Sequence, residues 1–308
     1  FYMIYTVTFN PAIDYVMHFP QVQHGNVNRS VGEQMFFGGK GINVSVVLSQ
    51  LGVENTALGF IAGFTGDELE KGVRAMGVNT DFVRLKDGKT RVNVKICDEH
   101  EVTELNANGP DIDDEALAEL FAKIDRLQDG DTIVLAGSIP KCLPWDTYET
   151  LLARLEGKDI RIVVDAEKEL LTDTLKYKPF LIKPNTEELA AIFGKPVSVM
   201  GVDQVRECAM KLQEMGARNV VVSMGSNGAF LLDENGGKHF HTAFTGNTVN
   251  AVGAGDSMVA GFLAGVSESY DYALVLGLAA GAATAFSDGI AEKEAIGEIM
   301  KQAGLSIL

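Results

Sequence analysis

The sequence predicts an α/β protein with a mainly parallel central sheet, covered by helices on both faces, and a small second sheet. Strand-like and helix-like segments alternate over most of the chain, as a parallel sheet requires. The 33 glycines against only 8 prolines are typical of many tight strand-to-helix turns. β-prone stretches within residues 14–37 and 90–106 interrupt the alternation. We therefore expect one three-layer domain over residues 1–308, from which those two segments project as a lid.

The N-terminal part of the chain begins with a buried strand at residues 4–9, which ends at Asn10-Pro11. A helix is predicted after the glycine-rich run at residues 38–41, because apolar residues then recur at helical spacing until Gly52. These apolar residues are Val44, Val47, Leu48 and Leu51.

The lid is expected to contain a strand at residues 90–97, which alternates in polarity. This strand can pair with residues 101–105 across a short turn. The β-prone stretches of residues 15–19 and 35–37 supply the rest of the small sheet.

The remaining two thirds of the chain alternate between helices and strands. An amphipathic helix with acidic residues in its first turn is expected at residues 113–124. Strands are then expected at residues 132–136, 161–164, 180–182 and 220–223, and helices at residues 145–155, 187–193, 202–215, 256–266 and 272–286. A hairpin joins residues 229–232 to residues 238–241 through Asn235-Gly236, a dipeptide typical of two-residue turns.

Charge and composition exclude several classes of function. The net charge of −16 repels nucleic acid and anionic membranes, so a phosphorylated ligand would need a local cluster of basic residues. Cys97, Cys142 and Cys208 show no metal-ligand spacing and are expected to be reduced thiols of a cytoplasmic protein. His239 and His241 share one strand face, which we interpret as solvated rather than as a metal pair.

The clearest chemical motif is the run Asn-Ala-Val-Gly-Ala-Gly-Asp-Ser at residues 250–257, directly before a predicted helix. Its small residues let the backbone approach a ligand, and the free amides at a helix start favour an anion. Asp256 could accept a proton from an attacking hydroxyl, or it could merely cap the helix. Taken alone, this motif favours the interpretation of Asp256 as a helix cap.

Four motifs in a fixed order make the sequence resemble the ribokinase/PfkB family. They are Gly-Gly-Lys-Gly-Ile-Asn at 38–43, Lys-Pro-Asn-Thr-Glu-Glu at 183–188, Ser-Met-Gly-Ser-Asn-Gly at 223–228 and Gly-Ala-Gly-Asp at 253–256. Such an ordered set is far more specific than any single motif. The resemblance implies a ribokinase-like fold and an ATP-dependent carbohydrate kinase.

The resemblance also implies roles around the transferred phosphoryl group. Asp256 corresponds to the family's catalytic base, and its anion hole corresponds to Gly253, Ala254 and Gly255. Lys183 is expected to meet phosphate oxygens.

On the nucleotide side, Asn185 and Glu188 are expected to organise Mg²⁺ through its waters, although the same pair can form a helix capping box. The residues expected to contact ATP are Ser223, Gly225 and Gly228, which otherwise form an ordinary glycine turn.

The sugar is expected to bind to residues of the N-terminal half. Asp14 lies in a segment that resembles the family's hydroxyl-binding carboxylate, and the alternative is a turn residue. Gly38, Gly39 and Asn43 resemble further sugar contacts. Ser138 follows the strand at residues 132–136, at the strand end where open α/β sheets bind ligands.

Positive charge suggests which sugar is bound. Lys40 stands inside the glycine turn, and Arg91 and Lys95 share one face of the predicted lid strand. We expect Lys40 and Arg91 to hold a phosphate, whereas Arg29 and Lys95 are weaker candidates. The run Arg-Val-Asn-Val-Lys at 91–95 most resembles the family members that phosphorylate fructose 1-phosphate.

The expected reaction is therefore transfer of the ATP γ-phosphoryl group to the 6-hydroxyl of fructose 1-phosphate. Kinases of tagatose 6-phosphate or fructose 6-phosphate are the alternatives within the family. A catalytically silent sugar-phosphate-binding protein is an alternative of another class, against which the presence of Asp256, Asn185 and Glu188 argues. A nicotinamide-dependent oxidoreductase is disfavoured, because the first strand leads into Asn10-Pro11 and not into a dinucleotide-binding glycine turn.

The expected partners are a phosphorylated ketose and ATP. An exposed edge of the lid sheet could pair with a second subunit, so a homodimer is also expected.

Overall fold

The central sheet has ten strands in this computed structural model, which describes residues 2–307. The strands are β1 (Ile4–Thr8), β4 (Asn55–Ile61), β5 (Asn79–Thr80), β6 (Val83–Arg84), β9 (Thr132–Ala136), β10 (Arg161–Asp165), β11 (Leu181–Ile182), β12 (Asn219–Ser223), β13 (Ala229–Leu232) and β14 (Lys238–His241). Their order is β14-β13-β12-β11-β10-β9-β1-β4-β5, with β6 also paired to β4. Every pair from β12 to β5 is parallel, and the β12–β13–β14 end is antiparallel.

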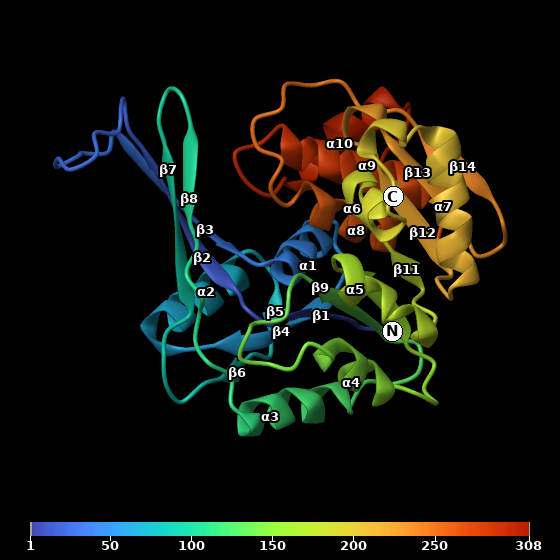
Figure 1. Ribbon diagram of the computed structural model, residues 1–308, viewed down its shortest axis with the longest axis horizontal. Helices are drawn as coiled ribbons and strands as arrows, with labels where there is room; N and C mark the ends of the chain where they lie inside the picture. The colour runs from blue at the N-terminus through green and yellow to red at the C-terminus, as the bar shows by residue number, and fades with distance from the viewer. Residues whose placement is uncertain (1, 308) are drawn as a thin grey trace.

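Helices cover both faces of this sheet (Figure 1). One face packs against α1 (Lys40–Gln50), α8 (Ala254–Gly265), α9 (Tyr270–Ala285) and α10 (Lys293–Gln302). The other face packs against α3 (Asp114–Ile124), α4 (Thr147–Ala153), α5 (Lys168–Thr172), α6 (Thr186–Ile192) and α7 (Val202–Glu214). Helix α2 (Gly63–Ala75) joins α1 in a third apolar cluster beside β4.

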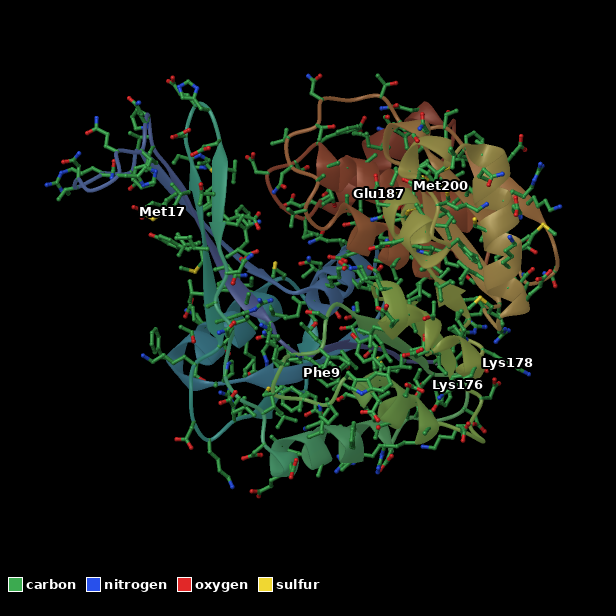
Figure 2. All side chains as sticks on the ribbon, in the orientation of Figure 1. Phe9, Met17, Lys176, Lys178, Glu187 and Met200 are labelled. Atoms are coloured by element: carbon green, nitrogen blue, oxygen red, sulfur yellow. The ribbon has the colours of Figure 1, made fainter. Side chains whose placement is uncertain are left out.

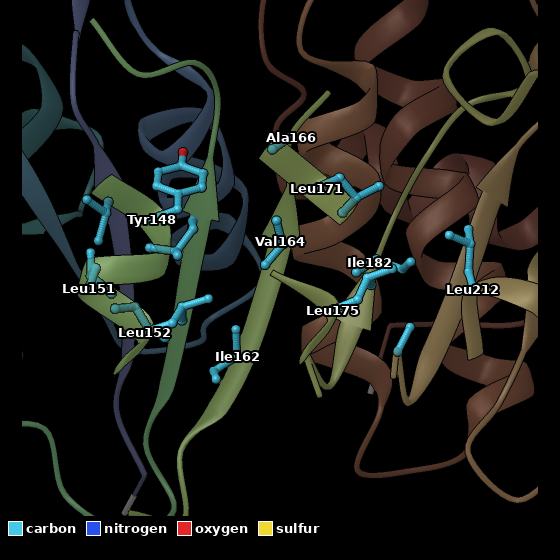
Figure 3. Packing of buried hydrophobic residues seen from close by; sticks show 14 of the residues in the cluster. Tyr148, Leu151, Leu152, Ile162, Val164, Ala166, Leu171, Leu175, Ile182 and Leu212 are labelled. Atoms are coloured by element: carbon cyan, nitrogen blue, oxygen red, sulfur yellow. The ribbon is translucent and has the colours of Figure 1, made fainter. Parts of the chain in front are cut away.

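The strands between these layers are apolar on both sides. In β9, Ile133 and Leu135 point into the cluster under α3 to α7, whereas Val134 points into the cluster under α1, α8, α9 and α10. Figure 3 shows the first cluster, to which α4 contributes Tyr148, Leu151 and Leu152 and β10 contributes Ile162 and Val164. Burial on both faces explains why these strands lack a polar and apolar alternation.

The second sheet projects to the left of the C-terminal helices in Figures 1 and 2. It consists of β2 (Ala12–His18), β3 (Gly32–Gly38), β7 (Arg91–Cys97) and β8 (Val102–Leu105), in the order β3-β2-β7-β8. The β2–β3 and β7–β8 pairs are antiparallel, and β2 pairs with β7 in parallel. In Figure 2, Met17 lies on this sheet and Glu187 lies on the other side of the view, on α6.

The predicted fold class is confirmed: an α/β fold with a mainly parallel central sheet and a small separate sheet. The predicted strands and helices are present with ends displaced by at most three residues, whereas β4, β5, β6, α2, α5 and α10 were not predicted. Residues 1 and 308 of the expected domain lie outside the described residues. Within residues 2–307, no helix is both long and apolar enough to cross a membrane.

Candidate active site

The turn before α8 has the shape of an anion site. Gly253 precedes the helix with φ of 80°, a conformation that side-chain-bearing residues rarely adopt. Asp256 is the third helical residue, so its carboxylate lies in the first turn, where the backbone amides lack helical partners. A Cβ on Gly255 would lie 3.1 Å from Nζ of Lys183. The Lys183 ammonium group therefore lies against this turn, which we call the anion turn (residues 253–255).

The Asp256 carboxylate is buried, and its pKa lies close to neutral pH. Only 5% of the residue is exposed, and Nδ2 of Asn43 donates a hydrogen bond of 2.8 Å to its Oδ2. Burial, and next the negative charge of Asp165, raise the pKa of Asp256 to about 6, against the opposing effects of Asn43 and two lysines. A carboxylate with such a pKa is ionised at neutral pH and can still accept a proton.

Asp165 is a central residue of the site that the sequence did not reveal. It is the last residue of β10 and is 2% exposed. Its Oδ1 lies 3.3 Å from Nζ of Lys183, and its buried Oδ2 has no hydrogen-bond partner but lies 3.8 Å from Nζ of Lys40. The available signal was an acidic residue at the carboxyl end of an apolar strand, at the edge where parallel strands of open sheets bind ligands.

A pocket of about 420 Å³ opens beside these charges. Its lining includes Gly39, Lys40, Arg91 and Ser138, four of the predicted sugar-side residues. Its other lining residues are Thr8, Phe9, Asn10, Ala136, Gly137, Ala166, Glu167 and Leu170. The pocket thus lies at the carboxyl ends of β1 and β9, as predicted for Ser138.

Two cations belong to the pocket lining. Nε of Arg91 donates to the carbonyl oxygen of Asn10 at 3.1 Å, a bond that does not use its two terminal nitrogens. Burial lowers the pKa of Arg91. Burial also lowers the pKa of Lys40, but four carboxylates together outweigh burial and raise the pKa overall; they are those of Asp165, Asp256, Glu188 and Glu167. Asp256 does not itself line the pocket. Lys40 connects it to the pocket, because Lys40 belongs to the lining and interacts electrostatically with Asp256.

The other predicted sugar residues are close to this pocket or on the small sheet beside it. Asp14 on β2 accepts a hydrogen bond of 2.8 Å from Nδ2 of Asn93 on β7. Gly38 ends β3, and a Cβ there would lie 3.5 Å from Oδ1 of Asn43. Asn43 therefore stands between the end of the small sheet and Asp256.

Two weaker candidates lie elsewhere. Lys95 forms an ion pair with Glu104 on β8, at 3.3 Å, and does not line the pocket. Arg29 is exposed in the segment between β2 and β3, also outside the pocket lining. A phosphate role for either residue remains a prediction.

The predicted nucleotide-side residues begin α6. Oδ1 of Asn185 accepts from the amide of Glu188 at 2.7 Å, and Oε2 of Glu188 accepts from the amide of Asn185 at 2.8 Å. This is the expected capping box. It leaves Oε1 of Glu188 outside the cap, and burial raises the pKa of this carboxyl group.

The loop after β12 lies beside that helix start. The amide of Ser223 donates to the carbonyl oxygen of Pro184 at 3.1 Å. Gly225 and Gly228 have φ of 54° and 98°, and a Cβ on Gly228 would lie 1.9 Å from the carbonyl oxygen of His241. Two of the four sequence motifs, at 183–188 and 223–228, are therefore neighbours in space.

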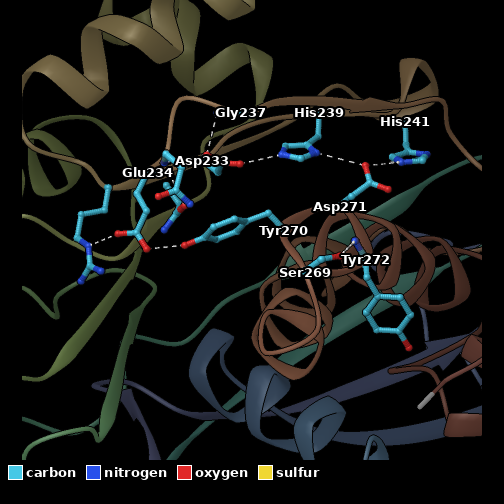
Figure 4. A network of polar contacts seen from close by, with 12 residues as sticks. Asp233, Glu234, Gly237, His239, His241, Ser269, Tyr270, Asp271 and Tyr272 are labelled. Carbon is cyan, nitrogen blue, oxygen red and sulfur yellow. Dashed lines mark hydrogen bonds and ion pairs between the residues drawn. The ribbon is translucent and has the colours of Figure 1, made fainter.

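The histidine pair is part of a surface network. His239 and His241 both contact Oδ1 of Asp271 at 3.3 Å, and His239 also contacts Oδ2 of Asp233 at 2.8 Å (Figure 4). The two histidines therefore share a face, as predicted. Within residues 2–307, no three His, Cys, Asp or Glu residues form a group that could hold a metal ion.

Comparison with known proteins identifies the family. A family model described as pfkB family carbohydrate kinase matches residues 7–295. The chain belongs to the pfkB family of carbohydrate kinases. As a member, it is a phosphotransferase that uses ATP as co-substrate.

Several relatives share the full length of this pfkB kinase. A 1-phosphofructokinase of Bacillus subtilis is 42% identical over 97% of this chain and 98% of its own. A D-tagatose-1-phosphate kinase of Bacillus licheniformis is 36% identical over 97% of this chain and 98% of its own.

Solved structures agree with the fold. The phosphofructokinase-2 of Escherichia coli in complex with substrates and products superimposes with a TM-score of 0.91, at 27% identity over 98% of this chain and 99% of that one. A ribokinase of Thermotoga maritima, 21% identical over 98% of this chain and all of that one, shares the fold with a TM-score of 0.74. The predicted ribokinase-like fold and family are therefore confirmed.

Proposed function

We propose that the chain transfers the γ-phosphoryl group of ATP to the 6-hydroxyl of fructose 1-phosphate, giving fructose 1,6-bisphosphate and ADP. The observation that carries the choice of substrate is the pair Lys40 and Arg91, which lie in the lining of one pocket. In a chain of net charge −16, two cations in one pocket favour a ligand that already carries a phosphate. The 42% identity to a 1-phosphofructokinase supports the same choice.

Asp256 is the general base of the proposed reaction. Its pKa of about 6 lies near the operating pH, where a base is both ionised and able to take the hydroxyl proton. Asn43 orients the carboxylate through its hydrogen bond to Oδ2. The amides of the anion turn and Lys183 would face the charge that develops on the transferred phosphoryl group.

Asp165 holds the two active-site lysines in place before the substrates arrive. Lys183 lies on the side of the anion turn, and Lys40 lies on the side of the sugar pocket. Each lysine could therefore exchange its contact with Asp165 for a contact with a substrate phosphate. The 3.8 Å separation of Lys40 from Asp165 is too long for a hydrogen bond, so Asp165 holds the Lys40 ammonium group by charge attraction alone.

Mg²⁺ is the cation that the nucleotide side fits. Glu188 keeps one carboxylate oxygen outside the capping box, and among the described residues it belongs to no group of three His, Cys, Asp or Glu side chains that could hold a metal ion by themselves. This agrees with a hydrated cation held through water by Asn185 and Glu188 and bound mainly to ATP phosphates. Bound there, Mg²⁺ would neutralise charge on the phosphates.

The small sheet would act as a lid and as a dimer interface. Its strands carry the exposed apolar residues Met35, Val102 and Leu105, of which 48%, 61% and 54% is exposed. Exposed apolar side chains on a sheet are a common basis for association. Solution scattering that shows only monomers under assay conditions would exclude the homodimer.

D-tagatose 1-phosphate is a second candidate substrate, because a relative 36% identical carries that name. Both candidates place the phosphate on carbon 1, whereas fructose 6-phosphate and tagatose 6-phosphate place it on carbon 6. Initial rates on all four sugar phosphates rank these possibilities. Faster turnover of either 6-phosphate would contradict the proposed orientation of the sugar.

The test of the base is Asp256→Asn, which keeps the size of the side chain. We expect ADP release with fructose 1-phosphate to fall by at least about 10²-fold, since general-base catalysis contributes about 10²–10⁴. Binding of fructose 1-phosphate, measured by calorimetry, should survive. Near-normal turnover would refute the role of Asp256, and absence of ADP release by the unmodified protein would favour a silent binding protein.

A further inference from the structure

Two adjacent aromatic residues hold strand β3 from opposite sides. Phe36 and Phe37 point to opposite faces of the strand. A Cβ on Gly72 of α2 would lie 2.1 Å from Cε2 of Phe37, and a Cβ on Gly289, between α9 and α10, would lie 2.9 Å from Cε1 of Phe36. Phe37 therefore packs against the N-terminal half of the fold, and Phe36 packs against the C-terminal half.

Phe36 lies on the same face of the small sheet as the predicted sugar ligand. Asp14 on β2 is the direct partner of Phe36 on β3 and of Asn93 on β7. Directly paired residues project from the same face of a sheet. The hydrogen bond from Asn93 to Asp14 confirms this for that pair. The row Phe36–Asp14–Asn93 thus runs across the small sheet, and Phe36 forms its end toward the C-terminal helices.

The segment that Phe36 contacts is joined to the anion turn. Ile290, next to Gly289, packs against the apolar clusters of both halves. A Cβ on Gly253 would lie 2.5 Å from Cδ1 of this isoleucine.

Polar contacts form a second connection between the same two regions. Oγ1 of Thr284 accepts from the amide of Ala291 at 3.2 Å and bonds to Oγ of Ser257 at 2.8 Å. Ser257 in turn donates to the carbonyl oxygen of Gly253 at 2.9 Å. These bonds join the segment at 284–291 to the start of α8.

We infer that Phe36 is a positioning residue, which couples the seating of the small sheet over the sugar to the shape of the anion turn through Gly289 and Ile290. This inference rests on the proposed function, because it takes Asp14 as a sugar ligand and the anion turn as a phosphate site. Its consequence is that the sugar phosphate and the nucleotide bind more tightly together than separately, by the same factor for each.

The experiment compares Phe36→Leu with Phe37→Leu, which remove the same ring from adjacent positions of one strand. Calorimetry measures the affinity for a non-hydrolysable ATP analogue with Mg²⁺, with and without saturating fructose 1-phosphate. In the wild type we expect the sugar phosphate to tighten nucleotide binding by at least about fivefold, the lower end of typical couplings. The factor should fall to near one in Phe36→Leu and persist in Phe37→Leu, while Phe36→Leu keeps its affinity for each ligand alone.

Ile290→Val is a second variant, far from the sugar, that shortens the side chain touching Gly253 and should also reduce the coupling. Unchanged coupling in Phe36→Leu, equal loss in Phe37→Leu or no coupling in the wild type would overturn the inference. Kinase rates of the wild type on each ketose phosphate test the proposed function separately. If another ketose phosphate is the substrate, the coupling is measured with that sugar.

Discussion

Replacing Asn43 with alanine should move the acid limit of turnover toward higher pH. Asn43 donates the hydrogen bond of 2.8 Å that stabilises the ionised form of Asp256, whose pKa is about 6. A hydrogen bond to a charged group contributes about 1.5–3 kcal/mol, and one pKa unit corresponds to about 1.4 kcal/mol. Loss of the bond should therefore raise the pKa of Asp256 by roughly one to two units.

The sign follows from the role of the base. Asp256 must be ionised to accept a proton, so activity declines as pH falls through its pKa. In the wild type, about nine-tenths of the carboxylate is ionised at pH 7; in Asn43→Ala, this falls to between about half and a tenth. The measurement is kcat from pH 5 to 9 at saturating substrates, which separates the ionisation of Asp256 from weaker sugar binding.

Asn93→Ala is the matched control, because Asn93 donates a bond of the same 2.8 Å length to a different carboxylate, that of Asp14. This variant should raise KM for the sugar phosphate and leave the acid limit of kcat where it is in the wild type. An acid limit that does not move in Asn43→Ala, or that moves equally in Asn93→Ala, would refute the assignment of Asp256 as the base.

Three further variants test other parts of the site. Arg91→Ala should raise KM for fructose 1-phosphate by roughly 10- to 100-fold, the loss of a charge-assisted contact, with KM for ATP within about twofold of the wild type in steady-state assays. Asp165→Asn should lower kcat at least about tenfold, because Lys40 and Lys183 lose their charged partner. It should also move the acid limit of kcat to lower pH than in the wild type, because the negative charge that raises the pKa of Asp256 is removed. Gly228→Ala should cost about 1–3 kcal/mol in urea unfolding, more than the Gly225→Ala control, which has open space around it; equal losses would contradict the role of the Gly228 contact.

Residues that act through the local backbone could be predicted from the sequence. Gly39, Gly228 and Gly253 have φ of 127°, 98° and 80°, a backbone conformation that favours glycine. The presence of glycine at these positions of the motifs therefore already indicates tight turns. The capping box of Asn185 and Glu188 is equally local, since it joins residues three positions apart. These short-range requirements explain why the four motifs located both sides of the candidate site.

Long-range contacts could not be predicted in this way. The bond from Asn43 to Asp256 joins residues 213 positions apart, and Asp165 acquires its role only when β9, β10 and β11 lie side by side. Helix α2 was missed because Gly66 and Gly72 weaken its helical propensity, while packing around Leu69 and Val73 stabilises it. Tertiary packing also decided that Lys95 pairs with Glu104 and does not face the pocket.

The parallel pairing of β2 with β7 has a consequence for protein engineering. These neighbours are separated in the chain by α1, β4 and α2, all of which belong to the main body. The small sheet therefore cannot be transplanted as one contiguous cassette, and a chimera must exchange two fragments together. An exchange of either fragment alone would pair a β2 strand from one protein with a β7 strand from another along the whole ladder. Substrate preference should therefore transfer only when both fragments are exchanged.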